Sequence, residues 1–250
     1  HDALPIWFSY PDFIEHDGRY YLTETQKTIA RVHEVDPALL EGMWRQGENR
    51  TAARDGLLIH RDAPGEFHMP DLPMLHNRDT ARVDPDTGAT LPGEALAVQA
   101  RGGPALEFLV RLAGLECGQM LFDSRDDQGR GMTVTTTDRG TLKLALAGRT
   151  WAAPGATWAG GLCESAWDCD PGLLSPGTWH HVVFVVDGGP KLVTVLVDGT
   201  LCDGGASRQY GWGRFHPDLK EANGAARARL APRLHGDLAL FRLYGRYLRT

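Results

Sequence analysis

GTWHHVVFVVDGGPKLVTVLVDGTLCDGG (Gly177–Gly205) carries the most regular strand pattern of the sequence. Two runs rich in valine and leucine, His180–Asp187 and Lys191–Val197, flank the turn sequence Gly188-Gly189-Pro190, and Asp198-Gly199 reverses the chain again. Apolar runs of this length between Gly-rich and Asp-Gly turns are typical of antiparallel strands in hairpins. The stretch therefore predicts neighbouring strands of one antiparallel sheet.

Strand patterns of the same kind recur on both sides of this stretch. They fall at Leu106–Leu112, Gln119–Asp123, Gly131–Thr136, Thr141–Leu146 and Gly236–Tyr244. Short strands repeated roughly every ten residues, with no amphipathic helix pattern between them, favour an antiparallel sandwich. We predict an all-β fold whose main part is a two-sheet antiparallel sandwich over residues 95–250.

The first 60 residues carry a separate group of patterns. Apolar or alternating runs occur at Ile6–Tyr10, Phe13–Glu15, Arg19–Glu24 and Ile29–Val35. Asp17-Gly18 predicts a hairpin turn, and Asp36-Pro37 predicts the start of a short helix through Trp44. These elements are too few to close a core of their own. We therefore predict a strand-rich segment over 1–60, an extended proline-rich connector over 61–94, and then the sandwich.

The composition restricts the class of protein. Hydrophobic residues make up 42% and charged residues 23% of 250 positions, which excludes a disordered chain. With 26 Lys and Arg against 32 Asp and Glu, and no basic block, we expect no nucleic-acid partner. No apolar run approaches the length of about 18 residues that a membrane span needs, so no membrane partner is expected. The sequence begins at His1 and not at Met, so we expect it to be a piece of a longer protein.

The segment Gly177–Gly205, with LEFLVRL (Leu106–Leu112) before it and GDLALFRLYGRYLRT (Gly236–Thr250) after it, resembles the LamG-like jelly-roll domains. These domains belong to the concanavalin A-like lectin/glucanase superfamily. The resemblance covers roughly residues 95–250. It implies two packed, curved antiparallel sheets and, in many members, glycan binding with a calcium ion.

YPDFIEHDGRYYLTET (Tyr10–Thr25) resembles one blade of the five-bladed propellers of glycoside hydrolase families 32 and 43. In those enzymes the carboxylate of the catalytic blade stands just before the proline, and Tyr10 occupies that place here. Asp12 follows the proline, so the family's nucleophile or base is not carried over to it. The resemblance implies a β-rich propeller remnant at the N-terminus and an upstream propeller domain as a partner.

Aromatic residues in irregular stretches are the candidates for sugar binding. Proteins hold a pyranose by stacking it on an aromatic ring beside polar groups that bond its hydroxyls. The candidates are Trp151, Trp158, Trp167, Tyr210, Trp212 and Arg214. The alternative is that these rings cap the sandwich edges or pack on the propeller. Trp179 starts a strand and is expected in the core, while the adjacent His180 and His181 point to opposite faces, with one of them buried.

An acidic loop and two cysteines allow further hypotheses. Asp123, Asp126 and Asp127 either supply ligands to a calcium ion or form a polar hairpin turn paired with nearby arginines. Cys169 and Cys202 form a disulfide if the two chain segments that carry them meet in space, and otherwise both are small buried hydrophobic side chains.

Catalysis by this chain alone is not expected, because glycosidases need two flanking carboxylates and no such pair stands out. Glu24, at a strand end, is the one candidate pocket residue of an intact enzyme. The leading hypothesis is a non-catalytic carbohydrate-binding or accessory module of a secreted or periplasmic glycoside hydrolase-like protein, with a glycan or polysaccharide as its partner. One alternative is a chain that supplies pocket residues such as Glu24 to an intact glycoside hydrolase. The other is a purely structural sandwich that supports a propeller.

Overall fold

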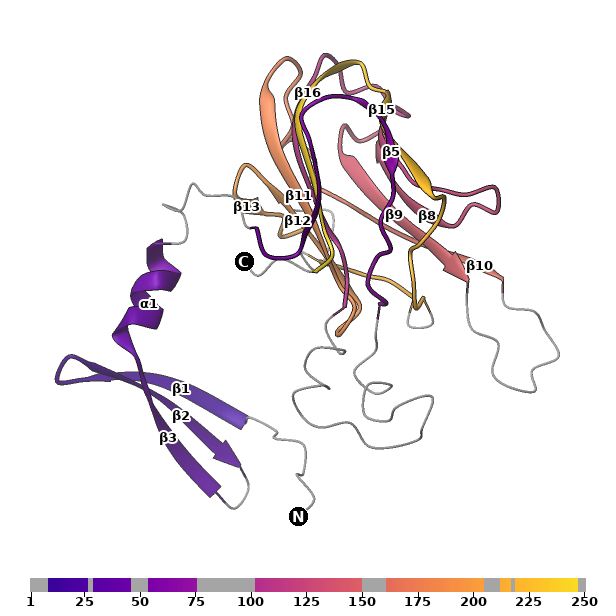
Figure 1. Cartoon of the computed structure of the whole chain (residues 1–250). Helices are drawn as coiled ribbons and strands as arrows, with labels where there is room; N and C mark the ends of the chain where they lie inside the picture. Colours follow the sequence, from indigo (N-terminus) through magenta and orange to yellow (C-terminus); the bar gives the residue numbers. More distant parts are fainter. Residues whose placement is uncertain are drawn as a thin grey trace, which may run out of the picture. The chain divides into compact units, whose positions relative to one another are not determined.

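The computed structural model describes residues 9–26, 29–45, 54–75, 102–149, 161–204, 212–216 and 219–246. The chain divides into two compact units, His1–Ala52 and Ala53–Thr250, whose elements are drawn in sequence colours in Figure 1. No helix within the described ranges is long and apolar enough to cross a membrane.

The N-terminal unit is a small antiparallel sheet followed by one helix. Its elements are β1 (Ser9–His16), β2 (Arg19–Gln26), β3 (Ile29–Val35) and α1 (Pro37–Trp44), and the strands lie in the order β1-β2-β3. The predicted hairpin turn is confirmed, because Asp17 and Gly18 both have positive φ angles, 52° and 72°. The helix start is confirmed as well, since the Asp36 carboxylate accepts a hydrogen bond of 2.9 Å from the backbone N–H of Ala38. The described strands of this unit form one three-stranded sheet, and a propeller is not shown.

The C-terminal unit is the predicted antiparallel sandwich. Its strands are β4 (Leu57–Arg61), β5 (Gly65–His68), β6 (Ala105–Leu112), β7 (Met120–Asp123), β8 (Gly131–Thr136), β9 (Leu142–Arg149), β10 (Leu162–Asp168), β11 (Trp179–Asp187), β12 (Leu192–Val197), β13 (Thr200–Leu201), β14 (Trp212–Arg214), β15 (Arg227–Arg233) and β16 (Gly236–Tyr244). The six-stranded sheet has the order β10-β9-β8-β7-β15-β5. The seven-stranded sheet has the order β13-β12-β11-β6-β16-β4, with β14 paired to β12. The two sheets form the two layers seen in Figure 1.

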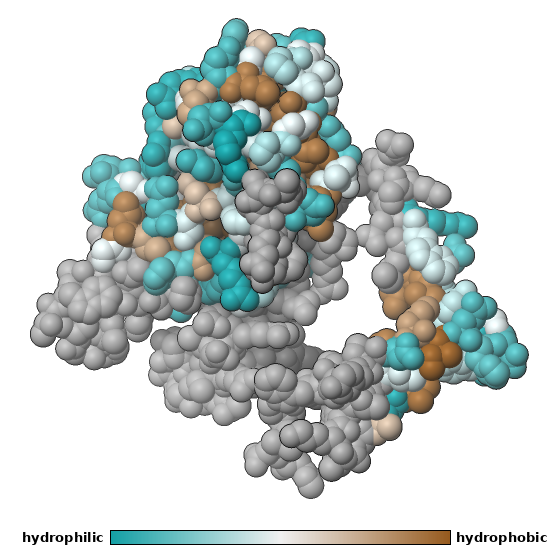
Figure 2. Space-filling view, turned by 180° about the vertical axis from the view of Figure 1, so that it is seen from behind, coloured by the Kyte–Doolittle hydropathy of each residue, from teal (hydrophilic) through white to brown (hydrophobic). Residues whose placement is uncertain are grey.

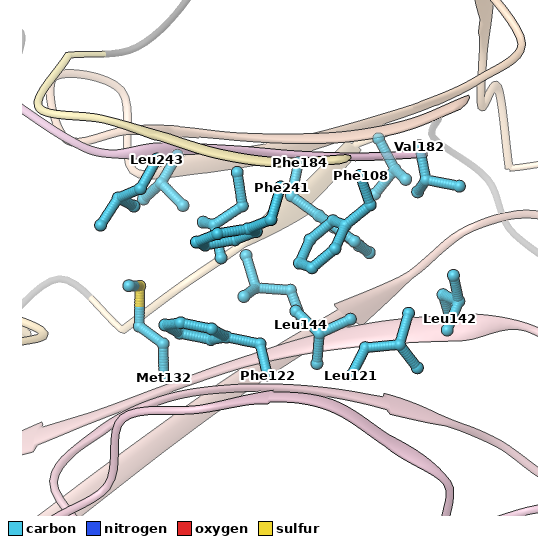
Figure 3. Close-up of a cluster of buried hydrophobic side chains, with 14 of the residues drawn as sticks. Phe108, Leu121, Phe122, Met132, Leu142, Leu144, Val182, Phe184, Phe241 and Leu243 are labelled. Carbon is cyan, nitrogen blue, oxygen red and sulfur yellow. The ribbon is translucent and has the colours of Figure 1, made fainter. Parts of the chain in front are cut away.

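The core of the sandwich fills the space between the two sheets, where alternate side chains of each strand point inward. Figure 3 shows these side chains reaching toward one another from both layers. The ring centroid of Phe241, on the seven-stranded sheet, lies 5.1 Å from that of Phe108 and 5.3 Å from that of Phe122 on the facing sheet. All three rings are fully buried, so aromatic contacts connect both layers at the centre of the core.

Two short strands that precede the predicted sandwich belong to its sheets. β4 pairs with β16 and β5 pairs with β15, so each sheet gains an edge strand. Phe67 on β5 is buried, with its ring centroid 5.8 Å from that of Phe241. The compact unit therefore begins at Ala53, whereas the predicted divisions fall at 60 and 94. The runs that form β4 and β5 are too short to be recognised as sheet from their sequence, and residues 76–94 of the predicted connector lie outside the described ranges.

The opposite edge of the sandwich, where β10 lies near β13 and β14, is closed by specific contacts and is called the β10/β13 edge below. The ring of Trp167 on β10 packs on the backbone of Gly213 in β14 so tightly that a Cβ at position 213 would lie 2.4 Å from it. Asp170, just after β10, accepts a hydrogen bond of 3.0 Å from the backbone N–H of Gly204, just after β13. These contacts hold the two sheets together at this edge.

Candidate functional site

The outer face of the seven-stranded sheet presents one side chain from each of three neighbouring strands. Trp179 opens β11, Arg111 lies opposite it on β6, and Asp237 lies opposite Arg111 on β16. Directly opposed residues of antiparallel strands project from the same face. The sequence neighbours His180 and Val110 are buried on the inner side. Trp179, Arg111 and Asp237, called the outer row below, are open to solvent, and the Trp179 residue is 40% exposed.

The three side chains of the outer row contact one another. Nε and Nη2 of Arg111 donate to Oδ2 of Asp237 at 3.0 and 2.7 Å. The same guanidinium lies over the ring of Trp179, 5.1 Å from the ring centroid. The carboxylate orients the guanidinium, and the guanidinium orients the indole, so an aromatic surface and two charged groups form one ordered patch.

A second polar cluster lies further along the same face, around Glu107 on β6. Its carboxylate accepts hydrogen bonds from His181 Nε2 at 2.9 Å, from the Tyr244 hydroxyl at 2.9 Å, and from Arg242 Nη1 at 3.1 Å. Burial raises the pKa of Glu107, but these donors outweigh burial and lower the pKa to about 2. Burial and the bond to this carboxylate raise the pKa of Tyr244 to about 12. Glu107 is therefore ionised at neutral pH. Its carboxylate holds the side chain of His181, which lies two residues after Trp179 on β11.

The two carboxylates of this face, Glu107 and Asp237, do not have the geometry of a glycosidase pair. Asp237 lies opposite Arg111, which is four residues from Glu107 on β6, so the two positions are roughly 13 Å apart along the strands. The catalytic carboxyl groups of glycosidases lie about 5–9.5 Å apart. With its pKa lowered to about 2, Glu107 also cannot donate a proton at neutral pH. The spacing and ionisation of this pair do not fit the acid and nucleophile of a glycosidase.

Beneath the outer row, His180 connects a serine and an aspartate without forming a catalytic triad. Its Nε2 accepts a hydrogen bond of 2.9 Å from the backbone N–H of Ser175, so Nδ1 carries the proton and donates to Asp198 at 2.7 Å. Burial raises the pKa of Asp198, but the bonds from His180 and from the backbone of His181 bring it below its usual value. The arrangement fixes the start of β11, where Trp179 lies. It confirms that His180 and His181 face opposite sides, with His180 buried.

The sequence of this sandwich matches the family model described as the concanavalin A-like lectin/glucanases superfamily over residues 86–250. The chain belongs to this superfamily. No curated protein matches the sequence.

Solved structures similar to this concanavalin A-like chain include the CBM40 of the Ruminococcus gnavus IT-sialidase bound to alpha2,3 sialyllactose. That similarity has 12% identity and a TM-score of 0.41, covering 78% of this chain and 95% of that chain. The binding domain of botulinum neurotoxin serotype D has 11% identity and a TM-score of 0.38, over 60% of this chain and 35% of that chain. A native heptameric SAP-like pentraxin from Limulus polyphemus has 12% identity and a TM-score of 0.38, over 80% and 74%. At such identities the likeness extends no further than the fold.

Of the six predicted sugar-binding residues of the concanavalin A-like domain, the structure describes the side chains of two, Trp167 and Arg214, and both belong to the β10/β13 edge. Trp151, Trp158 and Tyr210 lie outside the described residues. Trp167 is half-buried at the β10/β13 edge, where its ring packs on Gly213. This position agrees with the alternative hypothesis that these rings cap the edges of the sandwich. Trp212 lies on β14, and its side chain is outside the described part of the structure.

Arg214 is exposed on β14, opposite Leu192 of β12. Leu192 in turn lies opposite Asp187, which is eight residues from Trp179 along β11. At the usual rise of a strand this separation is roughly 27 Å. Arg214 and the outer row therefore lie at opposite ends of the sheet and do not form one subsite.

The acidic loop is built around a buried aspartate. The carboxylate of Asp123 accepts hydrogen bonds from Nε of Arg125 at 3.0 Å and from Nη2 of Arg229 at 2.6 Å. Burial raises the pKa of Asp123, but the bonds from Arg125 outweigh it and lower the pKa. Asp123 is thereby committed to two arginines.

The other two aspartates of the loop also fit a hairpin turn. Asp126 accepts hydrogen bonds of 2.9 Å from the backbone N–H groups of Gln128 and Arg130, and it forms an ion pair with the side chain of Arg130. Asp127 is exposed. Within the described ranges, no group of three or more His, Cys, Asp or Glu residues could hold a metal ion. The loop has the arginine-paired form that is the alternative to a calcium site.

Glu24, the candidate pocket residue, lies on β2 opposite Arg31 of β3. Its side chain falls outside the described part of the structure.

The expectation that Trp179 lies in the core is wrong. Inward positions of β11 are the even-numbered residues from His180 to Val186, so Trp179 has the opposite phase and faces outward. Valines on both faces of β11 hide this phase in the sequence. The neighbouring strand β6 does carry the signal, because Glu107 and Arg111 alternate with buried apolar residues and mark its outer face.

Proposed function

We propose that this chain is a non-catalytic carbohydrate-binding module whose glycan lies on the outer face of the seven-stranded sheet. The observation that supports this proposal is the outer row, where an exposed indole at Trp179 adjoins the Arg111–Asp237 pair. The Arg111 guanidinium lies over one face of the indole, so a pyranose would stack on the other face, and the charged pair beside the ring would bind the sugar hydroxyls. Membership in a lectin and glucanase superfamily is consistent with such a ligand.

The proposal extends from the outer row to the loop aromatics. Trp151, Trp158, Trp167, Tyr210, Trp212 and Arg214 remain proposed contacts to further sugar units. Because Arg214 and Trp179 lie at opposite ends of the sheet, a ligand that touches both is an oligosaccharide or polysaccharide and not a monosaccharide. The arginine pairing of Asp123 and Asp126 opposes the calcium proposal for Asp123, Asp126 and Asp127, and the same experiment tests that proposal.

A second candidate concerns the N-terminal unit, which we propose to be one part of a larger propeller-like β-domain of a parent glycoside hydrolase. The supporting observation is that Phe13 and Ile14, neighbours on β1 that point to opposite faces, are 50% and 42% exposed. A sheet with apolar side chains exposed on both faces needs covering layers to be stable. In that parent protein, Glu24 is the residue proposed to reach a pocket.

The binding proposal is tested by screening the full chain on a glycan array, once with calcium and once with EDTA, followed by titration with the best ligand. Trp179→Ala is expected to weaken binding at least about 10-fold, the loss typical of a central aromatic contact. The matched control is Trp44→Ala, because Trp44 is also exposed but lies in the N-terminal unit. This control is expected to leave the affinity unchanged.

Each outcome separates the alternatives. Binding that disappears in EDTA supports the calcium proposal, and binding that survives EDTA removes it. If Trp179→Ala binds like the parent while Trp212→Ala does not, the ligand lies on the loops and the outer row is not the site. If the folded chain binds no glycan, the sandwich is a structural support for a neighbouring domain.

The propeller proposal is tested by amide hydrogen exchange on the full chain. We expect the amides of β1, β2 and β3 to exchange far faster than those of β6 and β11, because among the described residues no second sheet covers them. Equal protection in the two units would show that the N-terminal sheet is stable alone, and the need for a larger β-domain would disappear.

A further inference from the structure

The β10/β13 edge carries two cysteines that extend the edge strands of facing sheets. Cys169 directly follows β10, and Cys202 directly follows β13. The N–H of Cys169 donates to the carbonyl of Leu142 at 3.0 Å, and the N–H of Cys202 donates to the carbonyl of Val195 at 2.9 Å. Each cysteine thus continues the ladder of its own sheet by one residue.

Both cysteines lie on the inner side of their sheets, and the Sγ of Cys169 accepts a hydrogen bond of 3.3 Å from the backbone N–H of Leu142. Leu142 and Val195, which lie opposite the two cysteines, are fully buried, and opposed residues of a ladder share a face. Cys169 and Cys202 are themselves fully buried and belong to the main hydrophobic core. The two side chains therefore face the same interior from opposite sheets.

The chain segments that carry the thiols are close together. The hydrogen bond of 3.0 Å from Gly204 N–H to the Asp170 carboxylate limits the separation of the Cα atoms of Asp170 and Gly204 to about 8 Å, and Cys169 and Cys202 lie one and two residues from them. The charge of Cys202 also acts on Cys169, although burial is the larger cause that raises the pKa of Cys169, to about 12. Disulfides form between Cα atoms about 4.4–6.8 Å apart, so the bond requires the ends of β10 and β13 to come within this range.

We propose that Cys169 and Cys202 form a disulfide that joins the two sheets when the chain folds in the presence of a disulfide oxidant such as glutathione disulfide. The structure has the reduced form of this pair, with both residues as thiols. The bond would cross-link the edge that Trp167, Gly213, Asp170 and Gly204 otherwise hold by non-covalent contacts.

The oxidation uses one glutathione disulfide for each protein disulfide. One cysteine thiolate attacks a glutathione sulfur, which forms a mixed disulfide and releases one glutathione thiolate. The second cysteine thiolate attacks the protein sulfur of that mixed disulfide and releases the second glutathione. Two electrons pass from the protein sulfurs to glutathione, and the two cysteine protons end on the released glutathione thiolates. Burial raises the pKa of Cys169 and so suppresses its thiolate in the folded domain, which places the reaction before the edge closes.

The test uses the full chain with Cys117→Ser and Cys163→Ser, which leaves the proposed pair as its two cysteines. The reduced, denatured protein is refolded in a mixture of reduced and oxidised glutathione, and its thiols are counted in denaturant. We expect the count to fall from two to zero and the mass to fall by about 2 Da. A peptide map without reductant is expected to join the fragments that contain Cys169 and Cys202. The Tm is expected to be about 5–10 °C higher than after treatment with dithiothreitol.

The matched control carries Cys169→Ala in the same background. It is expected to show the same circular dichroism spectrum, one thiol, and no dependence of Tm on reductant. Two reactive thiols after oxidative refolding of the parent would overturn the proposal, as would glutathione adducts or intermolecular dimers in place of the internal bond. A bond that forms but leaves the Tm unchanged would also contradict it. None of these outcomes depends on whether the chain binds a glycan.

Discussion

The two units of this chain have strands of similar length but very different burial. β2 in the N-terminal unit and β6 in the sandwich are each eight residues long. On β6, Phe108 and Val110 are at most 1% exposed, because a second sheet covers them. In the N-terminal unit, Leu40 is the only buried hydrophobic residue among those that the structure describes.

The two units differ in burial because the sandwich has two layers of sheet, and not because the strand patterns in the sequence of the N-terminal unit are weaker. The hairpin of β1 and β2 has the expected turn, and Phe13 stacks on Tyr20 with ring centroids 5.6 Å apart. Yet apolar residues of this unit remain at the surface in the space-filling view (Figure 2). Burial of apolar area is the main source of stability, and it requires an opposing layer that local sequence does not supply.

The largest expected contrast comes from removing one phenylalanine ring in each unit. Phe241→Ala is expected to lower the free energy of unfolding by about 3–5 kcal/mol, because its ring is fully buried among Phe67, Phe108 and Phe122. Phe13→Ala is expected to cost less than about 1 kcal/mol, since Phe13 is half exposed. Urea unfolding followed by circular dichroism measures both. Similar losses for the two variants would mean that a partner surface covers Phe13 in solution.

The second contrast concerns acid stability. Because the folded pKa of Glu107 is lowered to about 2, below its usual 4.5, its stabilising effect is complete above pH 4.5 and is lost as the pH falls through about 2. The effect is on the order of 2–3 kcal/mol. Glu107→Gln is expected to lower stability at neutral pH and to flatten the curve of unfolding free energy between about pH 4.5 and 2.

The control for this acid effect lies in the N-terminal unit. Glu34 pairs with Arg19 at the surface, where solvent screens the pair, so Glu34→Gln is expected to leave the acid curve unchanged. Urea titrations at several pH values provide the comparison. If the free energy of unfolding of Glu107→Gln still falls between about pH 4.5 and 2, other carboxylates cause the acid sensitivity of the sandwich.

The smallest expected effects are local to α1. Asp36→Ala removes the cap of this helix and costs about 1 kcal/mol, whereas Gly42→Ala gains about as much, because nothing lies within 4 Å of the added methyl group. Amide exchange should therefore become about five-fold faster in α1 for the first variant and about five-fold slower for the second. Exchange in β11 is expected to stay the same in both, and a change there would show that the two units are coupled.

The strands of the sandwich that the sequence predicts are those with clear alternation and clear turns. β6, β11, β12 and β16 were predictable for this reason, and the sheet register confirms them. β15 was missed because Arg227–Arg233 mixes arginines with Pro232, and its residue Ala231 takes a positive φ of 53°. A strand of this composition is recognisable only when its partners β7 and β5 are known.

The candidate site was harder to predict than the fold. Arg111 and Asp237 are 126 residues apart in sequence, and their pairing follows from the register of β6 with β16. Trp179 joins them only because β11 lies on the other side of β6. The residue types for a sugar site were visible in the sequence, but the face on which they meet depends on tertiary structure. The loop candidates Trp151, Trp158 and Tyr210 stay predictions.

The pairing of β4 and β5 with β16 and β15 has a consequence for synthesis on the ribosome. The partners of these two early strands lie roughly 160–180 residues further along the chain. At about 5–20 residues per second, β4 and β5 leave the ribosome roughly 10–35 seconds before their partners do. Phe67 and the edges of both strands remain without their final contacts for that time. Folding of the sandwich can be completed only when β15 and β16 have emerged, so protection of β4 and β5 by chaperones matters while the rest of the unit is made.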